Sequence, residues 1–263
     1  MDTTATESQG IAGSVSNPAR NVSLIVAYDG TNYHGWQRQP NATPVEETLT
    51  VAIERILDHD VKIIGGARTD TGVHAMGQVV NFATGKTIDH GSLCRGLNSM
   101  LPRDIRIRAA RDVEPAFHAR YSAKSKIYVY CVLSQRYNSP FLTRYVLHDP
   151  YPLNLAGMRR SAKILLGEHD FSAFKKKDEL YRNPVREVKR VGVAAPKGGV
   201  IYVIIEATGF LRYMVRNIVG TLLLVGHDRI NAEGFEAILE SRDRQKAGPT
   251  APAHGLFLRE IKY

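Results

Sequence analysis

A loop flanked by glycines carries the sequence GGARTDTGVHA, residues 65–75. Segments of strand character lie on both sides of it, residues 61–64 before the loop and residues 78–82 after it. Glycines allow unusual backbone conformations and close approach to a ligand, so this loop can present the carboxylate of Asp70 between two strands. A carboxylate placed in this way suits a nucleophile or a base, although an aspartate in a loop can also close an Asx turn.

The segments around this loop predict one compact α+β unit over residues 21–113. Strand patterns occupy residues 22–28 and 105–107, before and after the loop region. Apolar residues recur at helical spacing after Pro44 and again over residues 93–101, which Pro102 ends.

Residues 114–263 predict a second α+β unit of similar order. Its expected strands are 126–133, a hairpin of 188–195 and 200–207, and 256–263, and its expected helices are 155–166, 210–225 and 232–240. Two lobes that face each other across a cleft suit a large substrate, because ligand sites favour domain interfaces.

Composition indicates a globular, basic, cytoplasmic protein. The 263 residues include 35 Lys and Arg against 26 Asp and Glu, a formal charge of +9 that attracts polyanions. Residues 1–20 are rich in small polar residues, lack the pattern of a signal peptide and predict a disordered tail. Cys94 and Cys131 have neither zinc-ligand nor disulfide-framework spacing, and no apolar run reaches the roughly 18 residues of a membrane helix.

Arg216 lies in the predicted helix of residues 210–225, which is apolar nearly all round. A helix of that kind is buried. A buried guanidinium keeps its proton and therefore needs an anionic partner, either a carboxylate or a substrate phosphate. The other interpretation of Arg216 is a solvated surface arginine.

Tyr128 and Tyr130 lie on one face of the strand predicted over residues 126–133. Tyrosines in such a position usually pack half-buried, but they can also stack on a nucleobase. The alternation of the strand fits both interpretations.

Together these segments resemble the tRNA pseudouridine synthase A family, from about Asn21 to the C-terminus. The motifs that carry the resemblance, in order, are YDGT (28–31), GWQ (35–37), RTD (68–70), GVHA (72–75), GQV (77–79), LPRDI (101–105), FHAR (117–120), DFSAF (170–174), MVRNIVG (214–220), AGPTAP (247–252) and GLFL (255–258). The family usually has an arginine where this chain has Lys126.

The resemblance implies a pseudouridine synthase fold, with two α+β lobes and mixed, largely antiparallel sheets facing a basic central cleft. It implies a homodimer that converts uridines at positions 38 to 40 of the tRNA anticodon arm and needs no metal and no cofactor. The catalytic aspartate of the family corresponds to Asp70, its cleft tyrosine to Tyr128 and its paired arginine to Arg216.

The resemblance also assigns substrate contacts. Tyr128 is expected to stack on the uracil, Arg68 to help expose the target base, and His74, in the same motif, to contact the substrate. A cation beside a carboxyl lowers its pKa, so Arg216 is expected to keep Asp70 ionised.

Two other classes of function fit parts of the sequence. A non-catalytic tRNA-binding or chaperone protein needs the basic cleft but not Asp70, Tyr128 and Arg216. A metal-dependent hydrolase could use Asp70 and His74, but Gly72 between them argues against a helix, and further acidic ligands are missing.

Overall fold

The computed structural model of the protein describes residues 20–37, 42–196 and 198–263. The strands in these residues are β1 (Arg20–Tyr28), β2 (Ile64–Gly65), β3 (His74–Thr84), β4 (Ile105–Val113), β5 (Ser125–Ser134), β6 (Leu147–Asp149), β7 (Gly167–Asp170), β8 (Val185–Ala194), β9 (Val200–Ala207) and β10 (Leu256–Lys262). The helices are α1 (Val45–Leu57), α2 (His90–Met100), α3 (Leu155–Lys163), α4 (Met214–Gly226) and α5 (Ala232–Ser241), with 3-10 turns at Ser172–Phe174 and Ala253–Gly255. The expected α+β class is confirmed.

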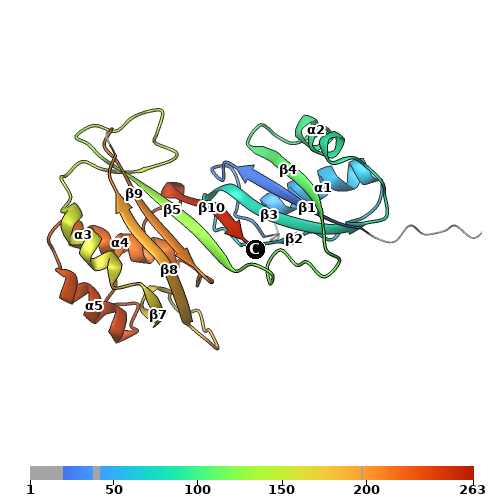
Figure 1. Ribbon diagram of the computed structural model, residues 1–263. Helices are drawn as coiled ribbons and strands as arrows, with labels where there is room; N and C mark the ends of the chain where they lie inside the picture. The colour runs from blue at the N-terminus through green and yellow to red at the C-terminus, as the bar shows by residue number, and fades with distance from the viewer. Residues whose placement is uncertain (1–19, 38–41, 197) are drawn as a thin grey trace, which may run out of the picture.

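Within the described residues, all the strands belong to one mixed sheet. Its order is β4-β1-β3-β10-β5-β9-β8-β7, with β2 paired to β3 and β6 paired to β5. The β10–β3 and β5–β6 pairs are parallel and the other pairs are antiparallel. Figure 1 shows two lobes along this sheet, one with α1 and α2 and the other with α3, α4 and α5.

The last strand of the chain, β10, joins the two lobes in the middle of the sheet. Phe257 of β10 is in register with His74 of β3, and Leu256 with Tyr130 of β5. The predicted boundary between residues 113 and 114 falls between β4 and β5, yet β10 brings the C-terminal segment back to the N-terminal lobe. The predicted tail of residues 1–20 lies outside the described residues, apart from Arg20, which pairs with Thr84.

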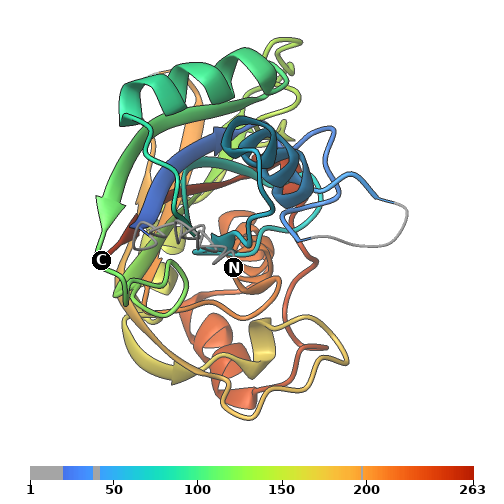
Figure 2. The same cartoon turned by 90° about the vertical axis from the view of Figure 1, so that its right-hand side faces the viewer.

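One continuous hydrophobic core covers the helix side of the sheet in both lobes. It combines the inward face of β1 and β3 with α1 and α2, and the inward face of β5, β8 and β9 with α3, α4 and α5. Figure 2 shows α1 and α4 on this same side of the sheet. Because the core is continuous, the cleft between the lobes has a packed floor. None of the helices in the described part of the chain has the length and apolar character needed to cross a membrane.

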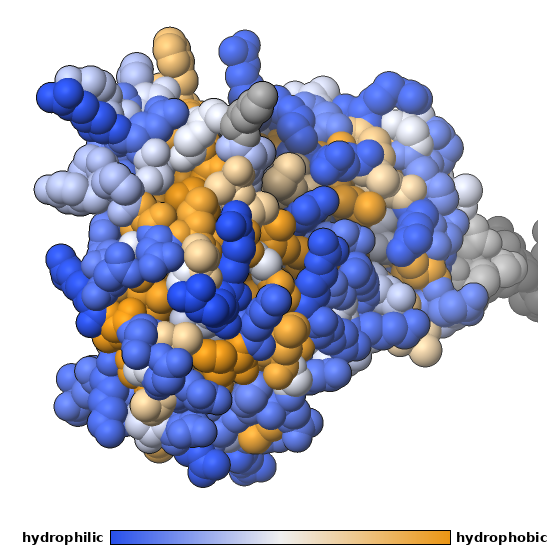
Figure 3. All heavy atoms as spheres, turned by 60° about the vertical axis from the view of Figure 1, so that its left-hand side comes forward, coloured by the Kyte–Doolittle hydropathy of each residue, from blue (hydrophilic) through white to orange (hydrophobic). Residues whose placement is uncertain are grey.

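A second, smaller apolar cluster lies on the opposite face of β5. It contains Val129, Cys131 and Leu133, with Val200, Tyr202, Ile204 and Phe257 partly buried around them. Figure 3 shows hydrophobic side chains gathered at the centre of the side of the molecule that carries β8 and β9, with hydrophilic residues around them.

Most predicted elements are confirmed, and two of the differences lie at the cleft. Strand β3 begins at His74, four residues before the predicted strand, so the loop that carries Asp70 is shorter than expected. Helix α4 begins at Met214 and not at residue 210, because Tyr213 adopts a left-handed conformation with φ 67°. Strands β6 and β7 are short and were not predicted.

Candidate active site

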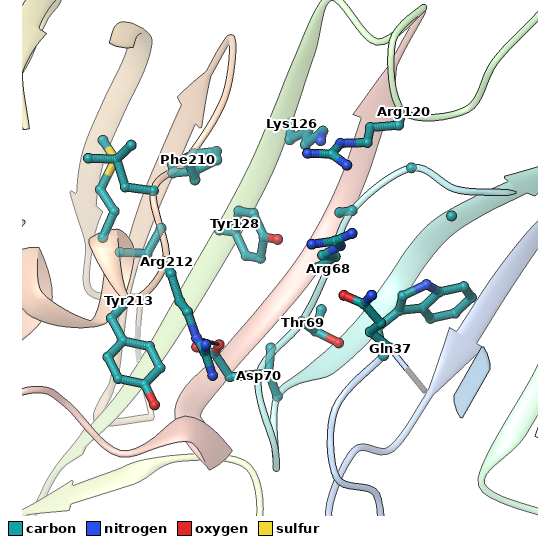
Figure 4. A pocket seen from close by; sticks show the side chains of 18 of the residues that line it. Gln37, Arg68, Thr69, Asp70, Arg120, Lys126, Tyr128, Phe210, Arg212 and Tyr213 are labelled. Carbon is teal, nitrogen blue, oxygen red and sulfur yellow. Dashed lines mark ion pairs between the residues drawn. The ribbon is translucent and has the colours of Figure 1, made fainter. Parts of the chain in front are cut away.

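A cleft of about 970 Å³ lies between the two lobes. Its walls come from the loop between β2 and β3, from β5, and from residues 179–181 and 210–216. This volume is in the range of small-molecule sites and accommodates a nucleotide. Figure 4 shows the polar side chains that point into it, among them Asp70, Arg68, Tyr128 and Arg212.

The loop before Asp70 is held by backbone and side-chain contacts to the N-terminal lobe. The N–H of Trp36 donates to the carbonyl of Thr69 at 3.1 Å, and the Thr69 hydroxyl bonds to the hydroxyl of Tyr28 at 2.8 Å. Gly35, with φ 87°, permits this approach, since a Cβ there would lie 2.6 Å from the Thr69 carbonyl oxygen. These contacts fix the backbone from which Asp70 projects.

Asp70 is paired with two arginines. Its Oδ2 lies 3.3 Å from Nη1 of Arg216, and its Oδ1 lies 3.7 Å from Nε of Arg212. The turn after Asp70 is closed by the backbone, where the N–H of Val73 donates to the Asp70 carbonyl at 3.1 Å. The carboxylate therefore faces the cleft, where it can act as a nucleophile or a base.

Burial decides the direction in which the pKa of Asp70 shifts. Its desolvation raises the pKa, and the charges of Arg216 and Arg212 oppose that rise without cancelling it, while Glu179 adds to it. Arg216 does lower this pKa, as expected of a neighbouring cation, but the net shift is upward because desolvation penalises the charged form more than the two cations favour it. A carboxylate with a raised pKa is a stronger base.

Arg216 is aimed at Asp70 by the chain around Ala251. Its Nε donates to the carbonyl of Ala251 at 2.7 Å, and the backbone N–H of Ala251 donates in return to the carbonyl of Arg216. The segment reaches α4 this closely because Gly220 has no side chain, and a Cβ there would collide with the carbonyl oxygen of Pro249. The motif of residues 247–252 thus supports the arginine from behind.

Arg212 and Tyr213 are site residues that the sequence did not assign. The Tyr213 ring lies against both guanidiniums, 5.5 Å from that of Arg212 and 4.8 Å from that of Arg216. A bulky residue in the left-handed region is strained, and such strain is typical of functional sites. Arg212 precedes Arg216 by four residues, a spacing that could have suggested a second cation.

Tyr128 and Tyr130, which alternation could not distinguish, have different environments. Tyr128 lines the cleft and packs edge-on against Phe210, with ring centroids 4.9 Å apart. Tyr130 is fully buried and donates its hydroxyl to the carbonyl of Pro252 at 2.8 Å, so it is a packing residue. Burial raises the pKa of Tyr128 above its usual value, which keeps the phenol protonated.

Arg68 lines the cleft, whereas His74 does not. The His74 side chain is 1% exposed; its Nδ1 accepts from the N–H of Gly30 at 3.0 Å, and its Nε2 lies 3.0 Å from the carbonyl of Arg144. Burial lowers the pKa of His74, although the Asp29 carboxylate, whose Oδ1 lies 3.1 Å from Nδ1, opposes this shift. The assignment of His74 as a substrate contact is therefore corrected: it is a structural residue at the start of β3.

The described residues contain no group of three or more His, Cys, Asp or Glu side chains arranged to hold a metal ion. A hydrolase would use Asp70 and His74 together. The contacts described above join these two side chains to different groups. Cys94 and Cys131 are free thiols, the first half-buried and the second buried.

A family model and the relatives found by sequence agree on one family. A family model described as tRNA pseudouridine synthase matches residues 24–122 and 161–263. A tRNA pseudouridine synthase A of Thermoanaerobacter sp. (strain X514) is 48% identical over 244 residues, which cover 93% of this chain and 100% of that protein. The protein of the same name from Acetivibrio thermocellus is 44% identical with the same coverage. Among solved structures, an archaeal box H/ACA sRNP Nop10-Cbf5 complex is similar at 14% identity and TM-score 0.34, over 86% of this chain and 60% of that chain.

Proposed function

The chain belongs to the tRNA pseudouridine synthase family, and we propose that it modifies uridines 38 to 40 of the anticodon stem-loop with Asp70, Tyr128 and Arg216 as catalytic residues. It has the pseudouridine synthase fold, and its reaction is the isomerisation of uridine to pseudouridine in tRNA. The observation that carries the assignment of residues is the position of Asp70, held between Arg216 and Arg212 at a cleft that Tyr128 lines.

The reaction breaks the C1′–N1 bond of uridine, turns the uracil and joins C1′ to C5. The C5 proton leaves and N1 gains a proton, so no atoms are added overall. A single carboxylate can start this sequence by attacking or deprotonating the ribose, or by adding to the base. Asp70 takes this role, and its raised pKa strengthens it as a base.

The substrate must enter the cleft as an extruded base. A paired or stacked uridine in an anticodon stem is inaccessible, and flipping it out costs a few kcal/mol. Tyr128 stacks on the flipped uracil, and Arg68, which is exposed in the cleft wall, fills or braces the space that the base leaves. Because its pKa is raised, Tyr128 contributes a protonated phenol beside the base.

Release of tritium from tRNA that carries C5-labelled uridine tests this assignment. Asp70→Asn should bind tRNA nearly as well as the natural chain and release no tritium, since the amide is neither a base nor a nucleophile. A tRNA-binding chaperone would give binding without tritium release in both proteins. Appreciable turnover by the asparagine variant would refute the role of Asp70, and mapping of the product tests positions 38 to 40.

We also propose that two copies of the chain form a homodimer in the cytoplasm, where tRNA is found. Support comes from the apolar outer face of β5 and β9, on which Val200, Tyr202 and Ile204 are only partly buried. Exposed apolar patches commonly mark protein interfaces. Light scattering after size-exclusion chromatography should give a dimer mass, and Ile204→Lys should shift it toward the monomer.

A further inference from the structure

Three basic side chains extend into one part of the cleft beside Tyr128. Lys126, Arg120 and Arg68 all line it, and Figure 4 shows their nitrogen atoms directed toward the same region. They come from β5 and from two loops that are distant in sequence, so only the fold brings their charges together.

Lys126 has no partner for its charge among the described residues. Its neighbours in the adjacent strands are Ala207 of β9 and Ile261 of β10, both apolar. Glu206 is in register with Ile127 and therefore lies on the other face of the sheet, where it bonds to Lys262 at 2.9 Å. The side chain of Lys126 is half-buried, and burial together with the charge of Arg120 lowers its pKa to about 8.

The two arginines beside Lys126 also lack an anionic partner within the described residues. Neither Arg68 nor Arg120 forms an ion pair with a carboxylate in the described part of the chain, and the guanidinium of Arg120 lies 5.5 Å from the ring of Tyr121. Both arginines are exposed, whereas Lys126 is half-buried, and a partly buried cation without a counter-ion raises the free energy of the free protein. Binding an anion between them removes that penalty.

We propose that Lys126, Arg120 and Arg68 form a subsite for a phosphodiester group of the RNA backbone, next to the uridine that stacks on Tyr128. Lys126 and Tyr128 are two residues apart on one face of β5, about 7 Å along the strand. A contact with phosphate fixes the position of the RNA without reading its sequence. The subsite rests on the proposed function, because it takes its place from the bound uridine.

Converging cations favour a phosphate over a carbonyl group of the base. A phosphodiester has a full negative charge and several acceptor oxygens, and both lysine and arginine bind it well. A base carbonyl would satisfy one donor at most and would leave the other charges uncompensated.

Binding of a tRNA transcript under a series of salt concentrations tests the subsite. The full chain with Asp70→Asn is used so that the substrate is not consumed, with Lys126→Met added and Lys163→Met as the matched control. Lys163 is an exposed lysine at the end of α3, away from the cleft lining. We expect Lys126→Met to raise Kd about tenfold or more and to reduce the slope of log Kd against log salt by about 0.7–0.9, the value for one lost phosphate contact. The control should change neither.

The pH dependence of binding adds a readout that a structural role would not change. Above about pH 8 the free Lys126 is largely neutral, so binding of a phosphate must be accompanied by proton uptake, and affinity should fall as the pH rises toward 9. Lys126→Arg keeps its charge over that range and should bind tightly at both ends of it. A contribution from His118 or Tyr121, which also line the cleft, would persist in the arginine variant.

The stability of Lys126→Met shows whether the variant is folded. Because it removes a half-buried unpaired charge, we expect its thermal midpoint to be at least that of the parent. Equal salt slopes for the Lys126 and Lys163 variants, or a pH profile of Lys126→Arg that matches the parent, would overturn the subsite. If the natural chain releases no tritium from the same transcript, the proposed function fails, and the binding data still report on the subsite.

Discussion

Replacing Arg216 by lysine tests whether Asp70 depends on a guanidinium or only on a positive charge. Arg216 uses two different nitrogens, Nε toward the Ala251 carbonyl at 2.7 Å and Nη1 toward Asp70 at 3.3 Å. The single nitrogen of lysine cannot occupy both positions, so one of the two contacts is lost.

The size of the effect follows from the contact that is lost. A hydrogen bond to a charged group contributes about 1.5–3 kcal/mol, and each 1.36 kcal/mol corresponds to tenfold in rate. If lysine keeps the carbonyl and releases Asp70, we expect the rate of tritium release to fall by about 10- to 150-fold. Single-turnover measurements with enzyme in excess separate this chemical step from product release.

Arg212→Lys is the matched control. Arg212 faces the same carboxylate, but it is 48% exposed and its Nε lies 3.7 Å away. Exposed ion pairs contribute about 0.2–1 kcal/mol, so its replacement should lower the rate by about fivefold or less. A fully active Arg216→Lys enzyme, or an equal loss in both variants at unchanged thermal midpoints, would refute the reasoning.

Changes at four other residues have directions that the structure determines. Asp70→Asn should raise the thermal midpoint at pH 7, because a carboxyl whose pKa is raised by folding destabilises the fold once it is ionised; the gain over the natural chain should disappear in acid, where both side chains are neutral. Tyr128→Phe should keep most of the affinity for tRNA, whereas Tyr128→Leu should weaken it by the roughly 1–3 kcal/mol of a stacked base, measured by equilibrium binding. His74→Ala should lower stability by about 1–3 kcal/mol in denaturant titrations, since it leaves the buried Gly30 N–H without its acceptor, and the activity of the folded fraction should be unchanged. Gly220→Ala should cost about 1–3 kcal/mol by the same titration and also slow tritium release, because the added methyl group displaces the segment that holds Arg216.

Local patterns were sufficient to predict most of the secondary structure. Alternation and helical spacing predicted β1, α1, α2, the β8–β9 hairpin and α5 to within a few residues, since each of these buries one regular face. The position of β10 between β3 and β5 depends on pairing between segments far apart in the chain, and no local pattern contains that information. The left-handed Tyr213, which delays the start of α4 to Met214, depends likewise on contacts made after folding.

The resemblance to the family identified Asp70, Tyr128 and Arg216, but the sequence could not give the electrostatic balance between them. Proximity of a cation suggests a lowered pKa for Asp70, and only the depth of burial reveals that desolvation outweighs Arg216 and Arg212 together. The role of His74 was also not predictable from the sequence, because this residue belongs to the catalytic motif and yet supports the backbone.

This balance explains why the site needs two arginines. A carboxylate lifted in pKa by burial is a better base, but without nearby cations it would take up a proton and lose its reactivity. Arg216, held from behind by Ala251, provides the fixed part of the compensation, and the more exposed Arg212 provides a second charge that the Tyr213 ring keeps close. Burial therefore makes the carboxylate of Asp70 more basic, while Arg216 and Arg212 both still favour its charged form.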